Sequence, residues 1–322
     1  MAIVVMRFDL RVPPFASTTH ARQYAACLEM CRWADALGID MCVLSEHHGV
    51  DDGFLPAPLT LAAAIAGATK RLPINVAALL VPLHDPIRLA EELAILDLVS
   101  GGRISIVAGL GYRQEEFEMA GVNRGERGKL LEEGIRVLRQ AWTGEPFTFR
   151  GRTVRVTPRP AHPIPIFLGG STAAAARRAA RLHTAFLPAI ADPELERVYH
   201  EECQRVGFEH GFVMMPGGPG FVHVSRDPER DWQRIAPHAL YDATTYAAWQ
   251  TPDQRSKVHV QGSTIEDVRS SGVYRVLNPE QCIALAREQG RLVLHPLMGG
   301  IDPELGWESL HLFEREVWPY IR

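Results

Sequence analysis

The sequence has few cysteines and no excess of positive charge, and both shortages narrow the classes of protein that it can encode. Its five cysteines among 322 residues are an odd number, and no two of them form a Cys-x-x-Cys pair. A disulfide framework is therefore not expected, and reduced thiols in a cytoplasmic protein fit best. The formal net charge of −4 gives no basic face for nucleic-acid phosphates, so no nucleic-acid partner is expected.

Long apolar runs are also missing. No stretch approaches the roughly 18 apolar residues that suggest a membrane span, so no membrane association is expected. The chain opens into a strand-like pattern over residues 2–10, without the basic and apolar regions of a secretory signal. Hydrophobic residues make up 46% and charged residues 22%, an ordinary globular balance that allows one large domain over 1–322.

Strand-like and helix-like segments alternate along most of the chain. Strands are expected at 3–10, 39–45, 73–81, 103–110, 164–168, 184–188, 220–225 and 292–295. Helices are expected at 20–37, 59–69, 86–99, 126–142, 172–182, 193–206, 228–248, 279–289 and 305–317. This alternation predicts a parallel sheet, and about eight strands predict an α/β fold of the (β/α)8 TIM barrel type with its site where the strands end. An open doubly wound sheet is the alternative, weakened by the lack of Gly-x-Gly-x-x-Gly after the first strand.

Two segments interrupt this alternation. Residues 145–165 alternate around a Gly turn at Gly151 and predict a hairpin insertion outside the barrel. Residues 249–277 show no clear period and are expected to form a mobile loop. Variable loops of this kind select substrates, so the substrate itself is not readable from the sequence.

A carboxylate and two imidazoles, Glu46-His47-His48, follow the second predicted strand directly. Histidine titrates near neutral pH, so this tripeptide is a candidate for proton transfer. A plain pair of surface histidines is the alternative. No metal site is expected, because adjacent side chains at a strand end point in different directions and no His-x-x-x-His helix accompanies them.

Small residues end the next three predicted strands. Ala77-Ala78 removes bulk from the barrel mouth, which would let a flat ring lie against the backbone, although ordinary tight packing explains the pair equally well. Gly109-Leu110-Gly111-Tyr112 ends the fourth strand, and Gly169-Gly170-Ser171 ends the fifth where a helix begins. Exposed N–H groups at a helix N-terminus attract anions, and structural capping accounts for part of this pattern. Two glycine-rich strand ends on one barrel face favour a phosphate site.

With these motifs, the chain resembles the bacterial-luciferase-like monooxygenase family. The most specific parts are Ser45-Glu46-His47-His48, the block 86–121 that contains Glu116-Phe117, and the turn 165–171. The resemblance runs from the first strand to about residue 185 and returns at 310–319. It implies a barrel that binds reduced FMN, or alternatively a deazaflavin coenzyme, at its C-terminal mouth. Deazaflavin-dependent relatives often have a single histidine in place of Glu-His-His, which favours FMN.

The same resemblance implies the activity and the partners. The expected function is that of a flavin-dependent monooxygenase, which uses reduced FMN and O2 on a small-molecule organic substrate. The alternatives are a deazaflavin-dependent hydride-transfer oxidoreductase and a non-catalytic flavin-binding subunit. A flavin reductase is the implied protein partner, and a homodimer through helices near the second and third strands is the implied assembly.

Individual roles follow from the resemblance as well. His47 matches the active-site histidine near the flavin ring, and Glu46 is expected to orient or tune it, while His48 stays unassigned. Ala77-Ala78 matches a non-prolyl cis peptide that supports the ring, and Gly170 and Ser171 would hold the phosphate. Gly109 stands where luciferase has an arginine near that phosphate, so the phosphate must be bound differently here.

Overall fold

The computed structural model describes residues 1–251, 254–256, 260 and 262–322. Within these residues, nine parallel strands form one sheet in the order β10-β9-β11-β1-β2-β3-β4-β7-β8. The strands are β1 (Ile3–Phe8), β2 (Met41–Leu44), β3 (Ile74–Leu79), β4 (Ile104–Ala108), β7 (Ile166–Gly170), β8 (Ala185–Pro188), β9 (Phe221–Val224), β10 (Tyr274–Leu277) and β11 (Arg291–Leu294). The helices are α1 (His20–Leu37), α2 (Pro58–Ala68), α3 (Pro86–Ser100), α4 (Gln114–Met119), α5 (Arg127–Ala141), α6 (Ala173–Arg181), α7 (Pro193–Val206), α8 (Pro228–Ala248), α9 (Ile265–Ser270), α10 (Pro279–Gln289) and α11 (Pro303–Glu316).

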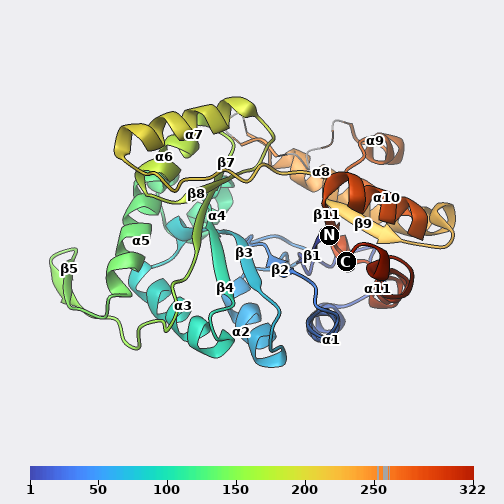
Figure 1. Ribbon diagram of the computed structural model, residues 1–322, viewed down its shortest axis with the longest axis horizontal. Coiled ribbons are helices and arrows are strands. Elements are labelled where there is room, and N and C mark those ends of the chain that lie inside the picture. Colours follow the sequence, from blue (N-terminus) through green and yellow to red (C-terminus); the bar gives the residue numbers. More distant parts are fainter. Residues whose placement is uncertain (252–253, 257–259, 261) are drawn as a thin grey trace.

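The strand order is that of a (β/α)8 barrel in which β7 and β8 are the fifth and sixth strands and β9 and β11 the seventh and eighth. Helices cover the outer face: α2 packs on β3, α3 on β4, α6 on β7 and β8, and α10 on β11 (Figure 1). The predicted α/β barrel fold is therefore confirmed. None of these helices, within the residues described, combines the length and the apolar character needed to cross a bilayer.

The barrel has a seam between β8 and β9 that backbone hydrogen bonds do not close in the described part of the chain. Instead, Phe186 of β8 exchanges two backbone hydrogen bonds of 3.0 Å with Phe212 and Met214. The edge of β9 is covered by the additional strand β10. The exposed edges of β8 and β9 thus form backbone hydrogen bonds with other segments although they do not pair with each other, and this satisfies their backbone N–H and C=O groups.

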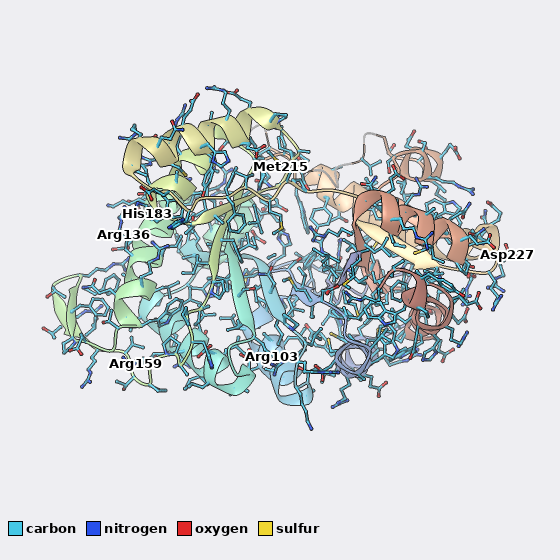
Figure 2. All side chains as sticks on the ribbon, in the orientation of Figure 1. Arg103, Arg136, Arg159, His183, Met215 and Asp227 are labelled. Atoms are coloured by element: carbon cyan, nitrogen blue, oxygen red, sulfur yellow. The ribbon has the colours of Figure 1, made fainter. Side chains whose placement is uncertain are left out.

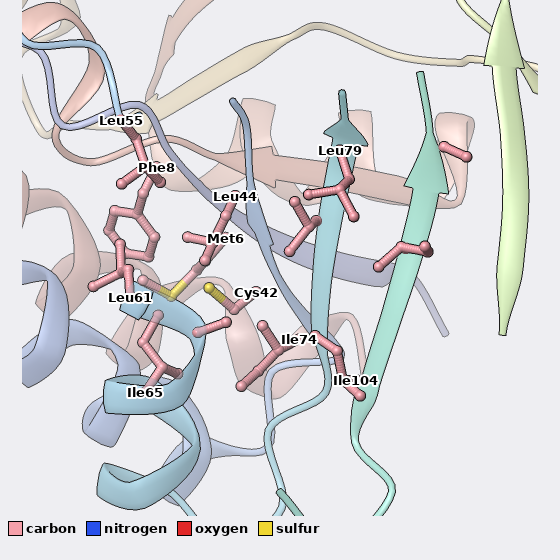
Figure 3. Close-up of a cluster of buried hydrophobic side chains, with 14 of the residues drawn as sticks. Met6, Phe8, Cys42, Leu44, Leu55, Leu61, Ile65, Ile74, Leu79 and Ile104 are labelled. Atoms are coloured by element: carbon pink, nitrogen blue, oxygen red, sulfur yellow. The ribbon is translucent and has the colours of Figure 1, made fainter. Parts of the chain in front are cut away.

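Alternation along the strands divides the side chains between two faces. Figure 3 shows the outward strand side chains in one cluster with Leu55 and with Leu61 and Ile65 of α2; the labelled strand residues are Met6, Phe8, Cys42, Leu44, Ile74, Leu79 and Ile104. The inward set of β1 and β2 includes Val5, Arg7 and Val43, which line a cavity. The near-continuous apolar strands therefore serve a core on one face and a binding space on the other.

Local signals place the helix ends as predicted. Gly38 ends α1 in the left-handed conformation, with φ of 87°, which glycine adopts without a steric penalty. Asp85 caps α3 by accepting the backbone N–H groups of Ile87 and Arg88, directly before Pro86 at the first helical position. Arg103 donates to the carbonyls of Ala66 and Thr69 at the end of α2. Figure 2 shows Arg103 among the helices, whereas the labelled Arg159 and Asp227 lie at the periphery.

The two segments that interrupt the alternation have different outcomes. The insertion contains the antiparallel hairpin β5 (Phe147–Phe149) and β6 (Arg152–Val154), whose labelled strand β5 stands apart from the barrel in Figure 1. The segment 249–277 contains α9 and β10, neither of which was expected from the sequence pattern. A capping box between Thr264 and Asp267 begins α9, and this Thr-x-x-Asp signal is visible in the sequence. Residues 252–253, 257–259 and 261 of the expected mobile loop lie outside the described residues.

Candidate active site

A cavity of about 390 Å³ lies at the C-terminal ends of the strands and extends into the barrel interior. Its wall combines strand ends, the end of α8 and the residues Gln250, Gln254 and Ser256. The ten residues predicted for catalysis or cofactor binding all lie on this wall: Glu46, His47, Ala77, Ala78, Gly109, Gly111, Tyr112, Gly169, Gly170 and Ser171. Their roles remain predictions, but the structure brings them together as one site.

His47 is buried, with 6% of its surface exposed. Its Nδ1 lies 2.9 Å from Oε1 of Glu116, and its Nε2 lies 3.4 Å from the hydroxyl of Tyr112. Phe54 and Trp249 enclose the ring, with centroids 4.6 and 4.8 Å away. Burial lowers the pKa of His47, and the hydrogen bond and charge of Glu116 oppose this effect. A neutral ring that donates through Nδ1 presents the free Nε2 lone pair toward Tyr112.

Glu46 points away from His47, because consecutive side chains of an extended segment alternate in direction. Its Oε1 accepts hydrogen bonds from Nε2 of His48 at 2.9 Å and of His84 at 2.8 Å. Its Oε2 accepts the backbone N–H of Leu80 at 2.6 Å. The expected role of Glu46, to orient or tune His47, has no direct hydrogen bond behind it among the described residues, and Glu116 bonds Nδ1 of His47 instead.

The ionisation of Glu46 follows from these three donors. Burial opposes the charged form, but the hydrogen bonds from His48 and His84 outweigh it and lower the pKa of Glu46 to about 2. Burial also opposes the cationic form of His84, yet the hydrogen bond and charge of Glu46 raise the pKa of His84. The unassigned His48 thus belongs to a carboxylate network at the end of β2.

Sequence reasoning missed Glu116 and His84 as site residues. Glu116 lies on the short helix α4, 69 positions after His47, among other acidic residues that resemble it in sequence. His84 follows β3 closely, and a polar residue at a strand end was the same signal that singled out Glu46-His47-His48. That signal, applied to β3, would have found His84.

The small residues bring backbone segments into close contact. A Cβ added at Gly109 would lie 2.7 Å from Cβ of Ala78, and one added at Gly170 would lie 2.5 Å from Cβ of Ala175. Gly170 also has a φ of 147°, which few side-chain-bearing residues adopt. The peptide bond between Ala77 and Ala78 is cis, as the resemblance implies. This side of the cavity is therefore lined by backbone and methyl groups and can accept a flat ring.

The start of α6 provides donors for an anion. Thr172 caps the helix by accepting the N–H of Ala175, while the N–H groups of Ala173 and Ala174 have no acceptor within the described part of the chain. Arg255 approaches the same turn: its backbone N–H donates to Oγ of Ser171 at 2.9 Å and its Nη2 to the Ser171 carbonyl at 3.2 Å. Free helix-terminal donors beside a guanidinium fit a phosphate group.

Curated proteins match parts of this chain. The chain is 30% identical over 129 residues to the oxygenase component of the flavin-dependent trigonelline monooxygenase of Acinetobacter baylyi, an alignment that covers 39% of this chain and 36% of that protein. It is 31% identical over 170 residues to the F420-dependent glucose-6-phosphate dehydrogenase of Nakamurella multipartita, covering 46% of this chain and 50% of that protein. The chain thus matches about half the length, or less, of these curated relatives.

The fold comparison covers nearly the whole molecule. The crystal structure of the monooxygenase RslO1 from Streptomyces bottropensis superposes with a TM-score of 0.78 and 20% sequence identity, covering 99% of both chains. A profile of the family described as luciferase-like monooxygenase matches residues 6–284. With most of the chain inside this match, the protein belongs to the luciferase-like monooxygenase family.

Proposed function

We propose that the protein is a flavin-dependent monooxygenase that uses reduced FMN and O2 on a small organic substrate. The observation that carries the proposal is the buried His47–Glu116 pair, which faces the same cavity as the flat Ala77-Ala78 wall and the anion-binding turn at Ser171. A flavin needs a flat wall for its ring and donors for its phosphate. Proton transfer beside that ring needs a titratable group, and His47 supplies it.

A reduced flavin bound at this mouth would supply two electrons to O2, of which one oxygen atom enters the substrate and the other leaves as water. His47 would hold or accept a proton at Nε2, the nitrogen not bonded to Glu116. Burial raises the pKa of Tyr112, so its hydroxyl stays protonated and donates toward Nε2. The rings of Phe54, Tyr246 and Trp249 around His47 exclude water from the reacting centre.

The test of this function compares cofactors and then turnover. Reduced FMN and a reduced deazaflavin coenzyme are titrated into the purified protein, and quenching of cofactor fluorescence is followed for each. We expect FMN to bind more tightly, and a panel of aldehydes, ketones and sulfonates to reveal O2-dependent turnover. Preferential binding of the deazaflavin would overturn the choice of cofactor and support the alternative, hydride transfer without O2, for which the F420-dependent relative is the precedent. Flavin binding without turnover on any substrate would favour a non-catalytic subunit.

The proposal includes a flavin reductase that supplies reduced FMN, because the curated relative with 30% identity is itself an oxygenase component. It also includes a homodimer in which α3 contacts a second copy. Ile95, Leu98 and Val99 on α3 are exposed to 48%, 43% and 51%, and neighbouring apolar side chains on one helix face favour burial against a partner. The length of α3 beside α2 provides an extended surface for this contact.

A further inference from the structure

The cavity continues from the mouth toward the opposite end of the barrel. Arg291, which lines it, is paired in register with Ile3 at the beginning of β1. Arg7, also on the wall, lies four residues further along β1. At about 3.3 Å per residue, the backbone levels of the two arginines are roughly 13 Å apart. The cavity is therefore long enough to hold more than a flavin ring at its mouth.

The wall between these levels is apolar. Between these levels, Val5 and Val293 face each other in register on β1 and β11. Val43, in register with Arg7, and Val107 continue the apolar wall on β2 and β4 toward the mouth. Valine is an ordinary filler of a barrel interior, but here a cavity of about 390 Å³ lies open against these four valines. The interior can therefore take the apolar body of a ligand.

The two arginines carry positive charge that the described part of the chain does not neutralise by contact. Nη2 of Arg7 donates to Oγ of Ser45 at 3.3 Å and to the hydroxyl of Tyr246 at 3.1 Å, while its Nε is buried without a partner. The Arg291 side chain has no hydrogen bond and no ion pair to any described residue, and its Nε is likewise buried. Burial without a counter-charge lowers the pKa of Arg291.

Two carboxylates, Asp9 and Asp242, lie near Arg7 and raise its pKa, but both already have other hydrogen-bond donors. Asp9 accepts the backbone N–H groups of Arg11 at 3.2 Å and Gly299 at 2.9 Å. Asp242 bonds Arg11 at 2.9 Å and Tyr274 at 2.7 Å. Among the described residues of the cavity wall, Glu46 is the single carboxylate, and three donors hold it. Both arginines are partly buried, and a cation that is partly withdrawn from water without a paired anion is unfavourable. The interior of the cavity is therefore complementary to an anionic group brought by a ligand.

We propose that the substrate is a small organic acid whose carboxylate binds Arg291 and whose apolar body lies along the valines toward the mouth. This inference rests on the proposed function, which assigns the mouth to the flavin and its phosphate to the turn at Ser171. The planar guanidinium matches the two oxygens of a carboxylate. Arg7, nearer to the mouth, adds favourable charge along the path of the acid.

Calorimetric titration of the full-length protein with octanoate and with octanamide tests this inference, because the two probes share length and apolar body but differ in charge. We expect the wild type to bind octanoate roughly ten- to a hundredfold more tightly than octanamide, the range for hydrogen bonds to charged groups. Arg291→Met should remove most of this preference, with Arg7 keeping the remainder, and Arg291→Lys should restore part of what is lost. Arg275→Met, at an exposed arginine of β10, is the matched control and should retain the wild-type preference.

Equal binding of the two probes by the wild type, or an unchanged preference in Arg291→Met, would overturn the inference. FMN and riboflavin binding is measured in the same variants, so that a failure of the acid site can be distinguished from a failure of the proposed function. We expect Arg291→Met to keep the wild-type preference for FMN over riboflavin. Loss of that preference would assign Arg291 to the flavin phosphate and overturn the acid site. Octanoate preference in a protein that binds no flavin would support the acid site and contradict the proposed function instead.

Discussion

The hydrogen bond between His47 and Glu116 allows a direct test of how the site controls protonation. Glu116→Gln removes the negative charge and keeps an oxygen that can accept from Nδ1 of His47. Burial already lowers the pKa of His47, and Glu116 opposes that effect. Without the carboxylate, the cationic form loses its stabilisation, so the pKa of His47 should fall further.

The size of this change can be bounded from the structure. Unit charges 2.9 Å apart attract by about 6 kcal/mol at an effective dielectric constant near 20. Desolvation of both groups offsets much of this attraction, and a carboxylate beside a titratable cation typically changes its pKa by roughly 1–3 pH units. We therefore expect the pKa of His47 to fall by that amount in Glu116→Gln.

The assay is a pH titration of the imidazole signals by NMR, with His47→Gln used to assign the His47 resonance. If neutral His47 is the active form, the acidic limb of the turnover profile should move to lower pH by the same amount. Glu115→Gln, at the exposed neighbouring position, is the matched control and should leave both measurements unchanged. An unchanged or raised pKa of His47 in Glu116→Gln would refute the reasoning, as would unchanged turnover in His47→Ala.

Three further predictions concern other parts of the molecule. The pKa of Glu46 is about 2, against an ordinary value of 4.5, so its negative charge stabilises the fold by about 3 kcal/mol above pH 4.5. This stabilisation disappears as the pH falls toward 2. In urea unfolding, Glu46→Gln should therefore be less stable than the wild type by about 3 kcal/mol at pH 7 and by little at pH 2. Arg255→Ala should weaken FMN binding roughly tenfold but leave riboflavin binding unchanged, and equal effects on both would remove Arg255 from the phosphate site. Leu98→Glu should turn a dimer into a monomer in light scattering after size-exclusion chromatography, and a wild-type monomer would contradict the assembly.

Much of the fold could be predicted from local signals. The helices at 20–37, 193–206, 228–248 and 279–289 have the predicted bounds, because Gly and Pro or capping residues mark their ends in the sequence. Strand β10 was missed because it is four residues long and adds to the edge of β9 rather than continuing the barrel rhythm. Its partner lies 53 positions earlier in the chain, Phe221 opposite Tyr274, and no local pattern records such a pairing.

The gathering of the predicted site residues followed from topology, because parallel strands place their carboxyl ends on one face. Which of these side chains contact each other depends on the direction in which each side chain points and on partners that are distant in the sequence. Glu46 and His47 are adjacent in sequence yet point apart, one to His48 and His84 and the other to Glu116.

Position 109 is a glycine where luciferase has an arginine, and residues from distant segments complete the site. Gly109 lies against the Ala78 methyl group, which an added Cβ would meet at 2.7 Å, and this leaves no space for a longer side chain. We propose that Arg255, which contacts Ser171 from 84 positions away and also lies 3.5 Å from Asp192, supplies the cation for the proposed phosphate site. Gly109 thus allows the Ala77-Ala78 wall to pack closely, while the proposed cation, Arg255, comes from another segment of the chain. If Arg255 takes the place of an arginine at position 109, both Arg255→Ala and Gly109→Arg should weaken FMN binding, but for different reasons. Arg255→Ala removes a contact with the phosphate. Gly109→Arg displaces the Ala77-Ala78 wall and should therefore weaken riboflavin binding as well.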